Sequence, residues 1–179
     1  MGNRPMALGL RTLRVRPAPL APGRAILLAG GLRLDCAVGV RGFAAAKREG
    51  DGRTPRGAFR LLDLWHRDRA PKVACALSAK AIRADDGWCD DPGHRAYNRP
   101  VRLPFAGGHE ALAREDGVYD LLVTLDHNRR PRVRGAGSAI FFHLARPGYP
   151  GTAGCVALAG ADMRRLLPRL ARGARIVIG

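Results

Sequence analysis

The sequence predicts a mainly β protein, a sandwich or barrel-like sheet with one or two short helices. Short apolar runs, several of them alternating with polar residues, recur along the 179 residues. Turn-forming residues, 23 glycines and 13 prolines, separate these runs, and few segments have the apolar spacing of a helix. With 46% apolar residues, the chain is long enough to bury a core. We expect a single domain over residues 12–179 after a flexible basic N-terminus, residues 1–11.

The strands are predicted from alternation and from short apolar runs. Leu13 and Val15 alternate with arginines, which indicates an edge strand. Between Leu32 and Val40 every second residue is apolar, the strongest strand signal in the chain. Residues 42–57 are rich in charge and glycine, which predicts a loop. The other expected strands are 25–29, 58–64, 73–77, 118–125, 139–144, 155–158 and 175–178.

Two segments are candidates for helix. Residues 110–115 are expected to make one or two helical turns. Met163, Leu166, Leu167 and Leu170 follow the i, i+3, i+4, i+7 spacing of an amphipathic helix. Asp162 suits the first turn or the cap of this helix, and Pro168 should shorten or kink it.

Residues 85–104 show no periodicity and predict an irregular surface loop that borders a cleft. Four aspartates cluster there: Asp85, Asp86, Asp90 and Asp91. They lack the ligand order and the terminal glutamate of an EF-hand, so we predict no calcium site.

The charge of the chain is strongly basic. Its net charge is +16, and only three of the 31 basic residues are lysines, which leaves 28 arginines. Such a charge favours long-range attraction to an anionic surface. Low aromatic content and the absence of a nucleic-acid-binding motif argue against specific nucleic-acid recognition. A solvated basic surface is the simpler alternative.

The four cysteines show neither C-x-x-C nor the Cys/His spacing of a zinc site, so no metal or other cofactor is predicted. Cys36 and Cys75 lie in apolar runs and are expected in the core. Cys89 lies in an acidic turn and is expected to be exposed. If Cys155 is to act as a free thiol, at most one disulfide can join the other three.

His143 and Cys155 are the candidate catalytic residues. They stand at the ends of two apolar runs that a Pro/Gly-rich turn, residues 146–151, separates, and a hairpin would bring them together. An imidazole beside a thiol can take its proton and return it to a leaving amine. Gly154 lets a substrate approach, and the N–H groups of Gly154 and Cys155 could stabilise an oxyanion. Alternatively, both residues only fill the core.

Several ordered blocks resemble the L,D-transpeptidase catalytic domain (YkuD-type) family, in its shorter bacterial branch. The family pattern of a His, a variable loop and Ser/Thr-x-Gly-Cys is similar to His143 and Thr152–Cys155 here. The segment Lys47–Phe59 matches the family's GDxxTPxGxF segment. The resemblance extends in order from about Cys36 to Ile178 and includes Asp86–Asp91, Tyr97–Val101 and Tyr119–Val123.

This resemblance implies a YkuD-type fold and a peptidoglycan transpeptidase. Cys155 would attack a stem-peptide carbonyl to form a thioester, and the side-chain amine of a second stem would resolve it. His143 would be general base and then general acid, held by the carbonyl of Leu144. Contacts to substrate are expected from Thr152, Ala153, Leu144 and Tyr149. The 42–57 loop would brace the catalytic sheet, and the aspartates of 85–104 could meet the free amine of a diamino-acid substrate.

The chain departs from the family pattern at two positions. Ala153 stands where many members have His, and Ala157 where many have Arg or Asn. The second change leaves the acyl donor open, so a 3,3 link through meso-diaminopimelate and a link from L-Ala at position 1 are both retained.

Two alternative functions and an expected cellular location follow. The same Cys/His pair could serve an L,D-carboxypeptidase or endopeptidase, with water as acceptor. A protein of another class would be a non-catalytic, basic polyanion-binding protein. The resemblance implies a carbapenem target, a role in cell-wall biogenesis and cell shape, and a place in the periplasm or cell envelope. Residues 1–23 show no secretory signal and no segment could span a bilayer. We expect a monomer.

Overall fold

The computed structural model describes residues 9–19 and 21–179. Its strands and helices, in chain order, are β1 (Leu10–Pro17), β2 (Arg24–Ala29), β3 (Leu32–Ala37), β4 (Phe43–Ala44), β5 (Thr54–Pro55), β6 (Gly57–His66), β7 (Ser78–Ala81), β8 (Asp86–Cys89), β9 (Pro100–Arg102), β10 (His109–Ala111), β11 (Leu121–Leu125), β12 (Phe141–Leu144), β13 (Val156–Leu158), α1 (Gly160–Leu166), the 3₁₀-helix η1 (Leu167–Arg169) and β14 (Leu170–Ile178). The mainly β prediction is confirmed.

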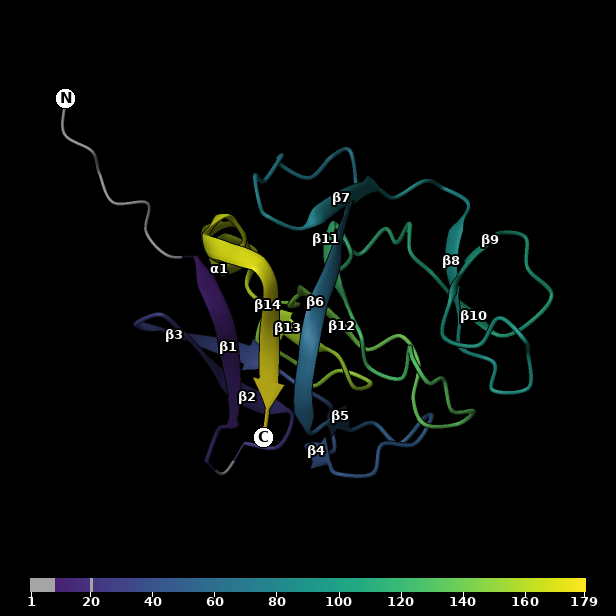
Figure 1. Ribbon diagram of the computed structural model, residues 1–179, viewed down its shortest axis with the longest axis horizontal. Helices are drawn as coiled ribbons and strands as arrows, with labels where there is room; N and C mark the ends of the chain where they lie inside the picture. The colour runs from purple at the N-terminus through teal and green to yellow at the C-terminus, as the bar shows by residue number, and fades with distance from the viewer. Residues whose placement is uncertain (1–8, 20) are drawn as a thin grey trace.

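The large sheet closes into a barrel. Its strand order is β11-β12-β13-β3-β2-β1-β14-β6-β7, and β11 also pairs with β6. The long strand β6 makes this closure, because Gly57–Arg60 pair with β14 and Leu61–His66 pair with β11. Figure 1 shows β1, β14 and β6 side by side, with the two-stranded β4–β5 ribbon below them.

Strand β1 was predicted to be an edge strand, but it lies inside the sheet. It pairs in parallel with β14 and antiparallel with β2. Alternation alone cannot distinguish an edge strand from an inner strand whose second face is exposed. Of the predicted flexible N-terminus, residues 1–8 lie outside the described residues, and β1 begins at Leu10.

The side chains of β12 and β13 alternate between two hydrophobic clusters, one inside the barrel and one outside it. Phe142, Val156 and Leu158 point into the barrel and belong to its main cluster. Phe141 and Cys155 point the other way, into a second cluster with Trp65, Trp88, Leu112, Tyr119 and Leu122. Successive side chains of a strand face opposite sides, so His143 shares the outer face with Phe141, and Ala157 shares it with Cys155.

The predicted hairpin between His143 and Cys155 is wrong. β12 and β13 run parallel, with Phe142 opposite Val156 and His143 opposite Ala157. Parallel neighbours need a crossover connection, and the Pro/Gly-rich loop supplies it. This loop is anchored on the segment after β3, where the Val40 N–H donates to the Thr152 carbonyl at 2.8 Å. Local turn residues could not distinguish this path from a hairpin.

A small antiparallel sheet, β10-β8-β9, covers the outer face of β12. Figure 1 shows it beside the barrel. Residues 85–104 are therefore not an irregular surface loop, since Trp88 and Tyr97 are buried and Trp88 meets Phe141 edge-on at 5.0 Å between ring centroids. The helical turns predicted over 110–115 are also absent there, because His109–Ala111 pair with β8 instead.

The C-terminal helix forms as its spacing predicts, but it is short. Met163 and Leu166 of α1 are buried, and Asp162 lies in its first turn without capping it. The turn that contains Pro168 is the 3₁₀-helix η1. Proline lies in the first turn of η1, where its missing N–H removes no hydrogen bond within the helix. In the described part of the chain, no helix is long and apolar enough to cross a membrane.

All four cysteines are free. Cys36 is buried as expected. Cys89 was expected to be exposed but is buried in β8, and Cys75 was expected in the core but lies half-buried in the non-strand segment 71–77. The predicted strand from Leu32 ends at Ala37, and Val40 is 56% exposed. The acidic neighbours of Cys89 wrongly suggested exposure, and the apolar neighbours of Cys75 and Val40 wrongly suggested burial. Burial depends on which segments of the chain pack over a residue, which its neighbours in sequence do not show.

Candidate active site

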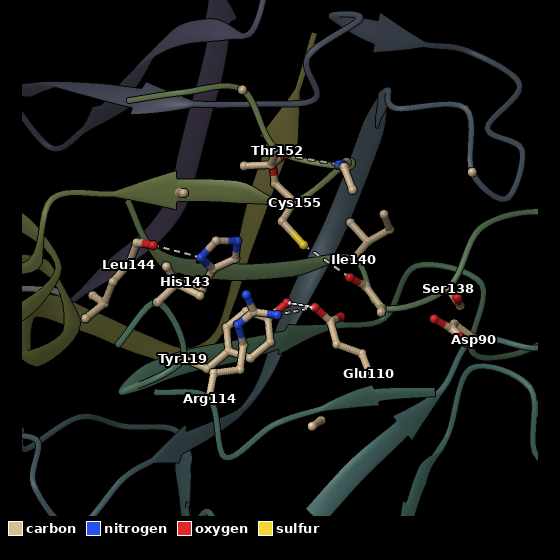
Figure 2. Close-up of a pocket in the computed structure, with 18 of the residues that line it drawn as sticks. Asp90, Glu110, Arg114, Tyr119, Ser138, Ile140, His143, Leu144, Thr152 and Cys155 are labelled. Carbon is tan, nitrogen blue, oxygen red and sulfur yellow. Dashed lines mark hydrogen bonds and ion pairs between the residues drawn. The ribbon is translucent and has the colours of Figure 1, made fainter. Parts of the chain in front are cut away.

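The outer face of β12 and β13 opens into a cavity of about 510 Å³. His143, Leu144, Cys155 and Ala157 line it from the barrel, and the segment 150–154 lines it from the crossover loop. Asp90, Glu110, Arg114 and Tyr119 line it from the small sheet and the segment after it. Figure 2 shows His143 and Cys155 pointing into the same space.

His143 is oriented by one backbone contact. Its Nδ1 lies 2.9 Å from the carbonyl oxygen of Leu144. A carbonyl can only accept, so Nδ1 carries the proton and Nε2 presents a lone pair. The ring of Tyr119 packs edge-on against the imidazole at 5.1 Å. Burial lowers the pKa of His143 to about 4, so the side chain is neutral at pH 7.

The Cys155 thiol is also neutral at rest. Its Sγ donates to the Ala139 carbonyl at 3.1 Å and accepts from the Phe141 N–H at 3.3 Å. Burial, with the charge of Glu110, raises the pKa of Cys155 to about 12. The backbone of Ala139, whose carbonyl accepts from the thiol, has a φ of 49°, which is unusual for a residue other than glycine. The site therefore holds a neutral thiol beside a neutral imidazole.

Thr152 and Gly154 shape the backbone before the cysteine. The Thr152 hydroxyl donates to the Cys155 carbonyl at 2.7 Å and accepts from the Gly154 N–H at 3.1 Å. Thr54, from the 42–57 loop, approaches the same carbonyl at 3.5 Å. Gly154 has a φ of 150°, and a Cβ there would lie 2.9 Å from the Arg53 carbonyl oxygen. Only glycine fits this turn.

Comparison with known families identifies the family of this chain. The family model for the L,D-transpeptidase catalytic domain (YkuD) matches residues 24–178. The chain belongs to this family. A comparison with curated proteins found no match. Among solved structures, Bdellovibrio bacteriovorus Bd1075 is similar at 13% identity and a TM-score of 0.45, over 96% of this chain and 48% of that one. This chain thus spans about half the length of that protein.

Within this L,D-transpeptidase domain, three of the four predicted substrate-contact residues line the cavity and one does not. Leu144, Thr152 and Ala153 line the cavity with His143 and Cys155. Tyr149 is not among the lining residues, because the loop turns its ring toward the guanidinium of Arg24, 5.3 Å away. Its φ of 52° accompanies this turn of the loop. His127, in the turn after β11, donates from Nε2 to the Ala136 carbonyl at 3.0 Å and lies outside the cavity lining.

Sequence reasoning missed several charged residues of the site. Lys47 is buried beside Gly154, and its Nζ binds the carboxylate of Asp51 at 2.5 Å. Glu110 and Arg114 come from residues 110–115, for which helical turns were predicted and which the sequence did not link to the site. Lys47 was within reach of sequence analysis, since it begins the block that resembles the family. Among residues 9–19 and 21–179, no group of three or more His, Cys, Asp or Glu side chains is arranged to hold a metal ion.

Gly154→Ala is expected to reduce acylation of Cys155 at least tenfold and to lower stability by about 1–3 kcal/mol, because the strained φ and the contact with Arg53 displace the nucleophile. Gly148→Ala is the matched control. It lies in the same loop with a φ of 76°, but its Cβ would meet nothing within 4 Å. Acylation rates and thermal unfolding of both variants check this. Equal acylation rates for the two would contradict the role of Gly154.

Proposed function

We propose that this domain is a cysteine-dependent L,D-transpeptidase that joins peptidoglycan stem peptides through a thioester acyl-enzyme. One observation carries the proposal: an imidazole with a free Nε2 and a thiol share one face of parallel strands at a cavity. The family supports the same class of reaction. The cell envelope is the place where such a substrate lies.

The acylation step follows from the neutral pair. The Cys155 Sγ leaves the Ala139 carbonyl and attacks the stem-peptide carbonyl carbon while His143 Nε2 takes the thiol proton. The Cys155 N–H is the proposed oxyanion donor, since Thr152 already engages the Gly154 N–H. His143 then gives its proton to the departing amine nitrogen as the C–N bond breaks. The products are a thioester and a neutral amine.

Substrate anchoring differs from the common family pattern at Ala157. Ala157 lies opposite His143 and lines the cavity without a polar group. Arg114 and Arg146 bring guanidinium groups to the same cavity, where both bind Asp116. We infer that these arginines take the anionic groups of the donor stem. A donor at position 3 and a donor at position 1 both stay open.

The deciding experiment uses disaccharide tetrapeptides and tripeptides that contain meso-diaminopimelate, with products followed by mass spectrometry. A transpeptidase yields dimers, and their fragmentation identifies the residue that supplied the acyl group. Shortened monomers without dimers, even at high acceptor concentration, would instead assign an L,D-carboxypeptidase or endopeptidase. Unchanged substrates would favour the non-catalytic alternative.

The basic surface supports attraction to an anionic envelope polymer. On the barrel strands, arginines occupy the outward positions that alternate with core residues: Arg14 and Arg16 on β1, Arg24 on β2, Arg60 on β6 and Arg175 on β14. Arg60 and Arg175 lie opposite each other in the register of β6 and β14. Clustered like charges on one face attract polyanions over a distance set by salt.

Binding to isolated cell-wall material is therefore expected to fall more than about tenfold between 50 and 300 mM salt, because screening shortens the range of attraction. Arg60→Glu with Arg175→Glu should weaken this binding while turnover of a small soluble substrate stays the same. Sedimentation of the protein with the wall material measures it. Salt-resistant binding to one nucleic-acid sequence would contradict the expectation and favour a nucleic-acid-binding protein.

A further inference from the structure

Glu110 lies across the cavity from the nucleophile. It is the middle residue of β10, paired with Trp88 of β8, so the small sheet holds it in place. Its carboxylate and Cys155 both line the cavity, and its charge is one cause of the raised pKa of the Cys155 thiol. Figure 2 shows Glu110 extending toward Cys155 from the opposite side.

One oxygen of this carboxylate is held and the other is available. Oε1 accepts from the Tyr119 hydroxyl at 2.6 Å and lies 3.6 Å from a guanidinium nitrogen of Arg114. Within the described residues, no hydrogen-bond donor or cation is found on Oε2. Tyr119 also packs against His143, so one side chain positions both the imidazole and the carboxylate. Glu110 is thus a fixed carboxylate with an unused acceptor atom at the reaction site.

A second polar group, the hydroxyl of Ser138, belongs to the same cavity as Glu110. The Ser138 hydroxyl is buried, with its residue only 5% exposed; it makes no hydrogen bond of normal geometry among the described residues, although it lies near enough to Tyr97 to offset part of the rise that burial causes in the pKa of that phenol. Ser138 lines the same cavity next to Asp90 in Figure 2. An ammonium group carries three N–H donors, which a carboxylate oxygen, a second carboxylate and a hydroxyl can accept. This end of the cavity is acidic although the chain has a net charge of +16.

In the proposed transfer reaction the acceptor amine must lose two protons, and His143 accounts for only one of them. The acceptor side-chain amine resembles that of lysine, so about one molecule in a thousand is uncharged at pH 7. An ammonium has no lone pair and cannot attack a thioester. His143 takes the proton that the amine loses as the C–N bond forms, and it returns this proton to the departing sulfur. The earlier loss of one proton from the ammonium needs a second base, either solvent before the amine binds or another group in the cavity.

We propose that Glu110 binds the ammonium group of the acceptor amine and is the base that converts it to the attacking amine. This inference rests on the proposed transpeptidase function. Oε2 of Glu110 takes one proton from the ammonium, and the amine nitrogen then attacks the thioester carbon. The C–S bond breaks, His143 relays the second proton from nitrogen to Sγ, and Glu110 releases its proton to solvent. The sum is an amide, a restored thiol and one released proton.

The surroundings of Glu110 suit this role. The titratable groups that face it are Tyr119, Arg114 and Asp116 from the segment after β10, Asp90 from the segment after β8, and Cys155 across the cavity. Burial raises the pKa of Glu110, with smaller upward contributions from Asp90 and Asp116, while Tyr119 and Arg114 lower it. A carboxylate of raised pKa is a stronger base than an ordinary glutamate.

Glu110→Gln is the central test, because the amide oxygen can still accept from Tyr119. At pH 7, formation of dimers from the acyl-enzyme should fall about 100-fold. Formation of the acyl-enzyme, measured as release of the leaving amino acid, should stay within about threefold. Between pH 7 and 9 the transfer rate of the variant should rise about tenfold per pH unit with the free-amine fraction, whereas that of the wild type should stay nearly constant.

A neutral nucleophile separates proton removal from a general defect of the site. Hydroxylamine is uncharged at pH 7, so Glu110→Gln should resolve the thioester with hydroxylamine as fast as the wild type does. Glu115→Gln is the matched control, since the Glu115 side chain is 87% exposed and outside the cavity lining. It should leave transfer, acylation and their pH dependence unchanged.

The outcomes distinguish this inference from the function on which it rests. If the wild type forms no acyl-enzyme or no dimers, the proposed function fails first. If the wild type forms dimers and Glu110→Gln transfers equally fast at pH 7, the role of Glu110 is wrong. An equal loss of acylation, of hydroxylamine reaction and of transfer would also overturn it, because Glu110 would then only support the architecture.

Discussion

Cys155→Ala is expected to abolish acyl-enzyme formation, with a loss of more than about 10⁴-fold, because no other group in the cavity can replace a thiol nucleophile. The thiol donates to the Ala139 carbonyl and accepts from the Phe141 N–H, so Cys155→Ala loses these two contacts but adds no bulk to the site. The fold should therefore survive, and loss of activity reports on the chemistry alone.

Intact-protein mass spectrometry measures this effect. A carbapenem, as the family suggests, should add one covalent mass to the wild type and none to Cys155→Ala. General alkylating reagents are poorer probes, because Cys75 is half-exposed while burial raises the pKa of both Cys155 and Cys36 to about 12. Cys36→Ala is the matched control, and an adduct on Cys155→Ala but not on this control would contradict the nucleophile.

His143→Ala is expected to lower acylation by about 10²- to 10⁴-fold, because both thiol deprotonation and protonation of the leaving amine pass through Nε2. The Leu144 carbonyl would lose its donor, so His143→Gln is the companion variant that keeps a polar side chain there. Both should fold and both should be slow. An unchanged rate in either would show that a different base serves Cys155.

The pH dependence of acylation provides a second measure of His143. Burial depresses its pKa to about 4 from an ordinary 6.5, so the base form is present at every pH above about 4. The rate should be level from pH 5 to 8 and should decline only as the pH falls through about 4. Single-turnover acylation across this range tests it. A decline centred near pH 6.5 would indicate an exposed imidazole and contradict the burial found here.

Alternation was sufficient to predict the fold class. The pairs of apolar and polar residues around Leu13 and Val15 and over Leu32–Ala37 specify strands whose inner residues are buried. Proline and helical spacing predicted the short C-terminal helix, and residue chemistry singled out His143, Gly154 and Cys155. These are local properties, and a short stretch of chain contains all the information for them.

Strand pairing was decided by the tertiary structure. Closure of the barrel through β6 and β11, the inner position of β1 and the parallel pairing of β12 with β13 depend on segments far apart in the sequence. No local pattern states which partner a strand selects.

The composition of the site divides in the same way. The sequence by itself determined which thiol and which imidazole are the candidates, because residue type and flanking residues are local, whereas the parallel pairing that places them on one face was decided by the tertiary structure. Only the tertiary structure placed Glu110, Arg114 and Tyr119 opposite them, since β10 pairs with β8 and lays this segment over the outer face of β12. The physical reason is that a residue's environment is set by the chain that packs on it, and long-range hydrophobic burial chooses that chain.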